Sequence, residues 1–418
     1  MGPSPRSELL SDRASTQQEI VRLASKPEVR SAFSWFRLHE AKLAQWQLEL
    51  ARIPAPPFGE SARSQWLVRK FNELGLEEVH QDQVGNVFGA HPGHGSSYIS
   101  LSAHLDTVFP AGTPLNVRQQ GSRLYGPGVS DNGAGVTAML AIAAALQDIA
   151  ISHALPLLFV GNVGEEGEGD LRGMRHIFSS PRWKNAIQAS LILDGAGTDT
   201  VVTEALGSRR FEVIVRGPGG HSWSDFGVPN PIVVLSRIIH EFAQTAVPTS
   251  PKTTFNVGVI RGGTSVNSIP ESASMRVDVR STSGEEMEKL EAALRRSADR
   301  VLAQERRTAE NRSGDRKSGL SLEFVLIGDR PAGELDPNSR ILQAIRLVDS
   351  FLGNSAHVQR ASTDANIPLS IGREAIAIGG GGSGGGAHTL QEWFECSGRE
   401  LGLKRILLTL LVLAGGCA

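Results

Sequence analysis

The stretch SAHLDTVF (residues 102–109) places His104 and Asp106 directly after an apolar run that predicts a buried strand. Four further motifs repeat this arrangement, each with an Asp, Glu or His after an apolar run. They are GVSDNGAG (128–135), GNVGEEGEG (161–169), LILDG (191–195) and GGGAHTLQEW (384–393). Because ligands in open α/β sheets bind beyond the carboxyl ends of the strands, we expect the five motifs to meet at one edge of a sheet.

Strand-like runs around these motifs alternate with helix-like segments. The strand-like runs are 84–90, 98–103, 156–162, 189–193 and 375–378, and the clearest helix is 133–149. Towards the N-terminus, residues 14–50 have helical spacing, the prolines of 53–60 end that pattern, and 61–75 predict another helix. The alternation predicts an α/β fold with a mixed, mostly parallel sheet flanked by helices.

The middle of the chain has a different pattern. Its order is strand 209–216, helix 230–246, strands 253–260 and 272–280, helix 283–306 and strand 320–327, with a polar loop at 308–319. This is the order of the split βαβ units in a ferredoxin-like α+β domain. We therefore predict a domain of residues 208–327 inserted into an α/β domain formed by 1–207 and 328–418.

Composition limits the classes of protein that remain. A chain of 418 residues with 40% hydrophobic and 21% charged residues is typical of a soluble globular protein of two domains. The formal net charge of −2 implies no broad field for nucleic acid or anionic membrane. Cys396 and Cys417 offer no disulfide framework. The N-terminal stretch lacks the apolar core of a signal peptide, and the apolar run 406–414 is too short to span a bilayer, so we expect a cytoplasmic protein.

Seven residues of the five motifs form a candidate metal site. They are His104, Asp106, Asp131, Glu165, Glu166, Asp194 and His388. Taken singly, each has a structural alternative: Asp131 as the N-cap of the helix 133–149, for example, or Glu165 and Glu166 as an acidic surface turn. Taken together, nitrogen and oxygen ligands without cysteine suit a catalytic zinc site. Two metal ions in one centre can both activate water and polarise a carbonyl.

The segment around His388 carries two further signals. The glycine run 379–386 lets backbone approach a ligand closely, which favours a wall of the site over a flexible loop. Thr389 and Glu392 have the spacing of a capping box, which predicts a helix beginning just past His388.

These motifs, in this order, resemble the co-catalytic zinc metallopeptidase family that includes peptidase T, glutamate carboxypeptidase, aminoacylase and acetylornithine deacetylase. The resemblance extends from about Arg52 to the end of the chain, with the peptidase T branch as the nearest match. It implies two Zn²⁺ ions per subunit, with Mn²⁺ or Co²⁺ as possible replacements. Gln391 is a departure, because an acidic residue is common after the metal-binding histidine.

The resemblance also assigns the metal ligands. Asp131 would bridge the two ions, and the Asp131–Asn132 peptide bond would be cis, as is frequent in the family. His104 and Asp194 would complete one metal site, and Glu166 and His388 would complete the other.

Three catalytic roles and four substrate contacts follow from the same resemblance. Asp106 would orient His104, Glu165 would be the general base, and His221 of GPGGHSW would stabilise the transition state. The inserted domain would act as a lid and as the interface of a homodimer. The substrate contacts would be Asn267, Arg280, Ser362 and Thr363.

The function expected from these residues is hydrolysis of peptide bonds in short peptides, as in aminopeptidases and tripeptidases. Water activated by two zinc ions would attack the carbonyl carbon, with Glu165 as the base. Two alternatives remain: a deacylase of N-acyl amino acids, and a non-catalytic metal- or peptide-binding protein on the same fold. The presence of Glu165 beside a full ligand set argues against the second.

Overall fold

The computed structural model describes residues 18–313 and 319–416 and divides the chain into two compact units. The first unit contains the described residues up to Ala205 together with those from Glu334 onward, and the second is Leu206–Gly333. The sequence placed the ends of the inserted segment at 208 and 327, a few residues inside the second unit.

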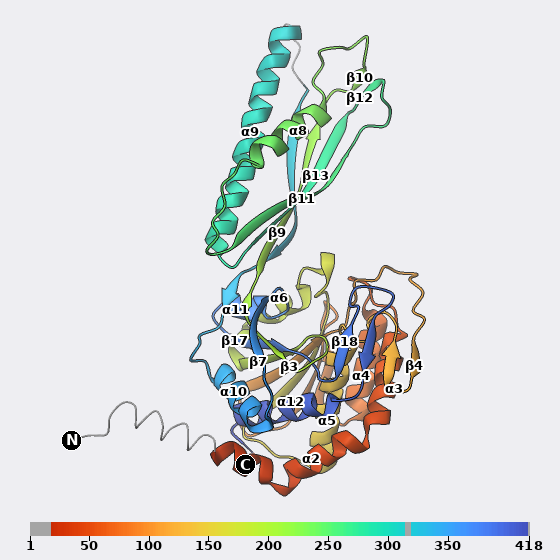
Figure 1. Cartoon of the computed structure of the whole chain (residues 1–418), viewed down its shortest axis with the longest axis vertical. Helices are drawn as coiled ribbons and strands as arrows, with labels where there is room; N and C mark the ends of the chain where they lie inside the picture. Colours follow the sequence, from red (N-terminus) through yellow and green to blue (C-terminus); the bar gives the residue numbers. More distant parts are fainter. Residues whose placement is uncertain (1–17, 314–318, 417–418) are drawn as a thin grey trace, which may run out of the picture. The chain divides into compact units, whose positions relative to one another are not determined.

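A nine-stranded mixed sheet forms the centre of the first unit (Figure 1). Its order is β1 (Glu77–Gln81), β2 (Val87–His91), β6 (Leu157–Asn162), β3 (Tyr98–His104), β7 (Ile187–Leu193), β17 (Glu374–Ile378), β8 (Thr200–Ala205) and β15 (Gly333–Glu334), with β16 (His357–Ala361) paired to β8. The four neighbours β6, β3, β7 and β17 are parallel to one another. Strand β2 is antiparallel to β6, and β1 is antiparallel to β2. The predicted α/β fold with a mixed sheet is confirmed.

Helix α5 (Gly133–Ile149) is the most buried helix of this unit. Each of its residues from Gly133 to Leu146 is buried, because its sequence is small or apolar on every side. Trp35 of α2 donates a hydrogen bond to Asp148 at 2.8 Å and so joins α5 to the N-terminal helices. The other labelled helices of the unit are α2 (Pro27–Leu38), α3 (Glu40–Ala51), α4 (Ser61–Glu73), α6 (Arg172–Ser179), α7 (Pro181–Ala186), α10 (Arg340–Leu352), α11 (Asn366–Ser370) and α12 (Arg399–Leu413). Residues 18–25 are helical as well.

The helical pattern of residues 14–50 is divided in the structure. Pro27 begins α2, as proline often does in the first helical turn, and α2 ends at Leu38. His39 separates α2 from α3, and its ring stacks on Trp35 at 4.1 Å between centroids. Residues 14–17 of the prediction lie outside the described residues.

A small four-stranded sheet lies in the first unit beside the motif segments. Its order is β18 (Ser383–Gly385), β19 (Trp393–Glu395), β5 (Arg123–Tyr125) and β4 (Arg118–Gln120). It joins the segment before Asp131 to the segment after His388, because β5 and β19 pair with each other.

The second unit is an antiparallel sheet with two helices on one side (Figure 1). The sheet order is β11 (Thr253–Gly262), β13 (Ser272–Ser281), β9 (Gly207–Arg216) and β14 (Ser321–Arg330), and the helices are α8 (Pro231–Phe242) and α9 (Gly284–Ser313). Alternate residues of β9, such as Phe211, Val213 and Val215, are buried in one apolar core with α8 and α9. The strand and helix order predicted for a ferredoxin-like α+β unit is present.

Helix α9 is longer than the sequence predicted. The prediction ended the helix at 306 and began a polar loop at 308, but α9 continues to Ser313. The polar composition of residues 308–313 suggested a loop, but this segment contains neither Gly nor Pro, which would end a helix. Residues 314–318 of the predicted loop lie outside the described residues.

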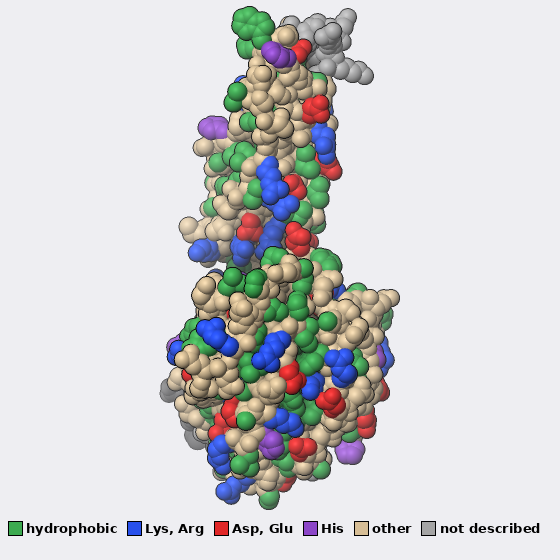
Figure 2. Space-filling view, turned by 90° about the vertical axis from the view of Figure 1, so that its right-hand side faces the viewer, with side chains coloured by type: hydrophobic (Ala, Val, Ile, Leu, Met, Phe, Trp, Pro, Cys, Tyr) green, Lys and Arg blue, Asp and Glu red, His purple; other side chains and the backbone are tan. Residues whose placement is uncertain are grey.

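The surface carries both signs of charge. On the face in Figure 2, basic and acidic side chains are interspersed, in keeping with the net charge of −2. In residues 18–313 and 319–416, every helix is too short or too polar to cross a membrane.

Candidate metal centre

The parallel strands bring the sequence motifs to one edge of the large sheet. His104 is the last residue of β3, and Asp194 directly follows β7. Glu165 and Glu166 come three and four residues after Asn162, the last residue of β6. The carboxyl ends of parallel strands lie at the same edge, so these side chains meet there.

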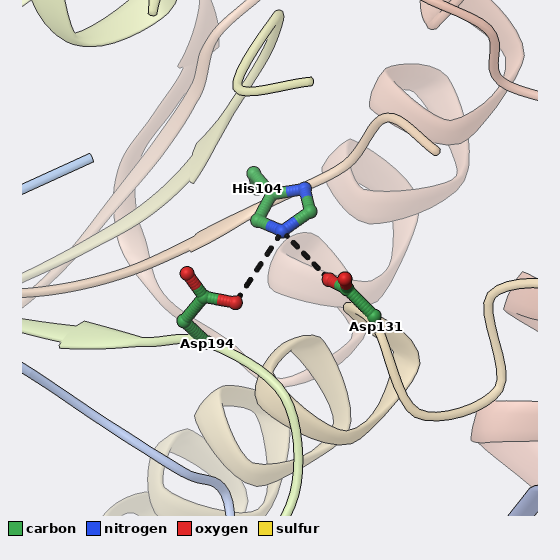
Figure 3. Close-up of side chains that lie close together, drawn as sticks. All are labelled: His104, Asp131 and Asp194. Carbon is green, nitrogen blue, oxygen red and sulfur yellow. Dashed lines mark hydrogen bonds and ion pairs between the residues drawn. The ribbon is translucent and has the colours of Figure 1, made fainter. Parts of the chain in front are cut away.

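His104 lies between two carboxylates. Its Nε2 is 3.2 Å from Oδ1 of Asp131 and 3.9 Å from Oδ1 of Asp194, and both carboxylates point at this nitrogen (Figure 3). The ligand atoms of the three residues lie within 4.8 Å of one another, which is close enough to hold one metal ion.

A second group of the same kind shares Asp131. Nε2 of His388 is 3.1 Å from Oδ2 of Asp131 and 3.0 Å from Oε1 of Glu166. These ligand atoms also lie within 4.8 Å of one another. The two carboxylate oxygens of Asp131 therefore face two different histidines, and Asp131 is the residue common to both groups.

The donor chemistry of the two groups fits a metal ion. Zinc takes imidazole nitrogen and carboxylate oxygen, and both groups consist of one histidine and two carboxylates. Burial raises the pKa of Glu166 to about 7, which reflects the cost of crowding buried carboxylates. The hydrogen bond to Asp131 raises the pKa of His388 to about 9. In the part of the chain that the structure describes, the ion pairs of Asp131, Glu166 and Asp194 are with His104 and His388.

Asp106 connects His104 to the Glu165–Glu166 turn. Its carboxylate accepts backbone hydrogen bonds from Glu165 at 3.0 Å and Glu166 at 2.7 Å. Nδ1 of His104 is 3.2 Å from the backbone oxygen of Asp106 and 3.7 Å from its carboxylate. With Nδ1 engaged there, Nε2 faces the carboxylates, as a metal-binding imidazole requires.

Glu165 lies at the centre but outside the two groups that share Asp131. Its side chain is buried, and its carboxylate lies within 4.8 Å of ligand atoms of His104 and Glu166. A carboxylate placed there is adjacent to both groups and can exchange a proton with a bound reactant.

Asp131 is not the N-cap of α5, which was the structural alternative for this residue. The cap of α5 is Asn132, whose Oδ1 accepts from the backbone of Gly135 and Gly195, each at 3.1 Å. Asp131 is therefore free of capping and points into the centre. The Asp131–Asn132 peptide bond is cis, as the family resemblance implied.

The helix predicted just past His388 is absent, and this prediction was wrong. Residues 387–392 form turns that lead into β19. The carboxylate of Glu392 accepts hydrogen bonds from the backbone of the 128–131 segment, which is far away in sequence, so it caps no helix of its own. Local spacing had no means of revealing that long-range partner.

The glycine run packs against the segment that follows Asp194. The backbone N–H of Gly380 donates to the oxygen of Gly195 at 2.9 Å. A Cβ at Gly379 would lie 2.4 Å from the oxygen of Ala196, so only glycine fits this approach. His388, two residues beyond the run, has a left-handed φ of 65°.

The loop of Ser362 and Thr363 lies in the first unit and carries a residue that the sequence analysis missed. Oγ1 of Thr363 accepts from the backbone of Ala365 at 3.1 Å and so supports the turn into α11. The next residue, Asp364, is fully buried and accepts from Nδ2 of Asn162 at 2.6 Å. Burial raises the pKa of Asp364 to about 7. Its sequence signal was weak, because it is an acid among small and polar residues, between Thr363 and Ala365.

Three predicted residues lie in the second unit. His221 is on β10 (Gly220–His221), which pairs with β12 (Ser268–Ile269), and the backbone oxygen of Asn267 accepts from Ser222 at 3.1 Å. Nδ1 of His221 accepts from the backbone of Trp223 at 3.2 Å. Arg280 is on β13 instead, and its Nε donates to Asp278 at 2.6 Å. The structure thus brings His221 and Asn267 together.

Two family models match the chain. Residues 203–306 match the peptidase dimerisation domain, and residues 86–212 match peptidase family M28. The first match falls on the second unit apart from its first three residues, and the second covers the segments of His104, Asp131, Glu166 and Asp194.

Several curated relatives are fungal proteins described as probable carboxypeptidases. The one from Aspergillus clavatus is 32% identical over 253 residues, which is 54% of this chain and 55% of that protein. The one from Paracoccidioides lutzii is 30% identical over 234 residues, which is 52% of each chain. The chain thus matches these relatives over about half their length.

Solved structures share the fold over nearly the whole chain. Aminopeptidase PepT from Bacillus cereus aligns with a TM-score of 0.70 at 19% identity, covering 90% of this chain and 99% of that one. A tripeptidase from Staphylococcus aureus gives 0.70 at 20% identity, covering 90% and 98%. The resemblance to the co-catalytic metallopeptidases that was drawn from the motifs is confirmed.

Proposed function

We propose that this chain is a cytoplasmic, metal-dependent hydrolase that cleaves amide bonds of short peptides with two zinc ions per subunit. The observation that carries the proposal is the position of Asp131. Its two oxygens face two histidines, each of which is grouped with a further carboxylate. A site for a single ion would not need a shared carboxylate between two such groups.

The ions, when bound, supply polarisation of the scissile carbonyl and acidification of water. Glu165 takes the proton of the attacking water and returns it to the leaving amine. Asp106 holds the turn that carries Glu165 by accepting its backbone N–H at 3.0 Å. The same carboxylate faces His104, so one residue fixes both the base and a ligand relative to each other.

His221 is proposed to stabilise the developing oxyanion. Its Nδ1 accepts a backbone hydrogen bond from Trp223, which favours the tautomer with the proton on Nε2. A donor on Nε2 of an exposed imidazole is what this role requires.

The proposed substrates are di- and tripeptides with a free carboxylate that Arg280 binds. A guanidinium binds a carboxylate through paired hydrogen bonds, and only Nε of Arg280 is used by Asp278. The sequence favours release of the amino-terminal residue. The fungal relatives described as probable carboxypeptidases favour release from the other end, so that reading is the second candidate.

A matched set of substrates tests the proposal. It consists of a tripeptide, its carboxyl-amidated form and the corresponding N-acetyl amino acid, each with and without a chelator. We expect chelator-sensitive cleavage of the free tripeptide, weaker cleavage of the amide, and release of the amino-terminal residue. Faster turnover of the N-acetyl amino acid would assign the chain to the deacylases instead. Binding of zinc without cleavage of any of the three would favour the non-catalytic alternative.

A further inference from the structure

The carboxylate of Glu392 lies against the backbone of the loop that carries Asp131. Oε2 accepts from the N–H of Gly128 at 2.8 Å, and Oε1 accepts from the N–H groups of Ser130 and Asp131, both at 2.7 Å. Glu392 is completely buried and belongs to neither ligand group. A side chain thus binds three N–H groups of one four-residue segment, one of them on the shared ligand itself.

A side chain of α3 also binds this loop, as a hydrogen-bond donor instead of an acceptor. The side-chain amide of Gln47 is buried, and its Nε2 donates to the backbone oxygen of Val129. Its Oε1 accepts from Nη2 of Arg399 at 2.7 Å, which fixes the orientation of the amide. The loop is therefore fixed from two sides, by an acceptor on its N–H groups and by a donor on its carbonyl.

The negative charge of Glu392 has a buried counterpart in Arg63. Burial lowers the pKa of the Arg63 guanidinium to about 10, and the charges of Asp106 and Glu392 oppose that shift. Nη1 of Arg63 also donates to the backbone oxygen of Leu105 at 2.8 Å. Leu105 lies between His104 and Asp106, so Arg63 holds the segment of His104 by a hydrogen bond and attracts Glu392 electrostatically.

We propose that Glu392 is a positioning residue that sets the backbone of Asp131 so that each carboxylate oxygen faces its own histidine. An ionised carboxylate is an acceptor at both oxygens and can satisfy all three N–H groups at once. No neutral side chain of this length does so. The effect on metal binding stands on the geometry of the loop, whereas an effect on turnover rests also on the proposed function.

The test compares Glu392→Gln with the wild-type protein by calorimetric titration of Zn²⁺ into the metal-free chain. The amide keeps the shape of Glu392 but turns an N–H₂ towards a backbone N–H, so at least one hydrogen bond is lost. We expect Zn²⁺ affinity to fall about 10- to 100-fold, as for other residues that support metal ligands. If peptides are cleaved, kcat should fall while KM changes little, because Glu392 touches no substrate.

Two further variants make the result decisive. Glu392→Asp keeps the charge and should restore part of the affinity, and it takes the place of Glu392→Gln if that variant does not fold. Glu395→Gln is the matched control, because Glu395 lies three residues away and bonds Arg123 and Ser397 instead of the loop. Wild-type zinc affinity in folded Glu392→Gln or Glu392→Asp, even with a lower melting temperature, would overturn the proposal. Zinc binding without peptide cleavage in the wild-type protein would instead count against the proposed function alone.

Discussion

Glu165 and Glu166 are neighbours in the sequence with different surroundings. Glu166 is paired to His388, whereas Glu165 lies outside the groups that share Asp131. We expect Glu165→Gln to keep the bound ions and lose about 10²- to 10⁴-fold in kcat, the usual contribution of a general base. Glu166→Gln should lose metal. Elemental analysis of both purified variants, together with kcat, checks this, and loss of metal from Glu165→Gln would refute the division of roles.

His91 and His153 form a buried pair that should make stability depend on pH. Nδ1 of His91 is 2.8 Å from Nε2 of His153, so the two rings cannot both be protonated without losing that hydrogen bond. Burial lowers the pKa of His91 to about 4 and that of His153 below its usual value, with the charge of a neighbouring histidine adding to the effect. The unfolded chain binds more protons below about pH 6.5, so the free energy of unfolding falls from there towards pH 4.

The prediction concerns how steeply the free energy of unfolding falls with decreasing pH. His91→Gln should lose less stability than the wild-type protein between pH 7 and pH 4, by on the order of 1 kcal/mol. His357→Gln is the control, since His357 is exposed at the start of β16 and does not belong to the pair. Denaturant unfolding at several pH values measures the slopes. Equal slopes for His91→Gln and the wild-type protein would show that the pair does not contribute.

Three of the candidate ligands, His104, Glu166 and Asp194, could be found from the sequence because each follows an apolar strand. Asp131 and His388 could be found because each lies in a short glycine-containing motif. Asp364 and Glu392 could not be found in this way. The position of Asp364 depends on its hydrogen bond with Asn162 on β6, and that of Glu392 depends on its hydrogen bonds with the 128–131 loop. Both partners lie more than 200 residues away in the sequence, beyond the reach of any local pattern.

At the scale of elements, a buried ion pair joins α10 to α12. The guanidinium of Arg405 is fully buried and donates to both oxygens of Asp349 at 2.6 and 2.8 Å. Arg405→Met should lower the free energy of unfolding by about 3–5 kcal/mol, because it leaves a buried carboxylate without its cation. Arg182→Met is the control and should cost about 1 kcal/mol or less, since its pair with Glu78 is exposed. Urea unfolding compares them, and a small effect at Arg405 would contradict this view.

Long periodic elements followed the sequence pattern, and strands of only three residues did not. The helix predicted at 133–149 has the same bounds as α5, because a long apolar stretch has few alternatives. The three-residue strands β4, β5, β18 and β19 have too few positions for an alternating pattern. The capping-box spacing at Thr389 failed for a related reason: tertiary hydrogen bonds to Glu392 outweighed a local preference.

At the scale of the whole molecule, we predict a homodimer through the second unit. Strand β11 is an edge of its sheet, and large apolar side chains are exposed on it and on α8, including Ile260 at 56% and Val233 at 44%. Ile260→Glu should therefore convert the dimer to a monomer, as measured by light scattering at micromolar concentration. Leu326→Glu is the matched control, since Leu326 is 54% exposed on the opposite edge strand, β14. A monomeric wild-type protein would contradict the prediction.

The zinc content per chain of the wild-type protein and of Asp131→Ala decides whether one carboxylate is shared by two metal sites. Asp131 is the residue that both ligand groups share, so its removal takes a ligand from each of them. We expect two Zn²⁺ ions per wild-type chain after dialysis, and fewer than one in the folded variant. A wild-type chain that holds no stoichiometric zinc, or an Asp131→Ala variant that still holds two ions, would contradict this expectation.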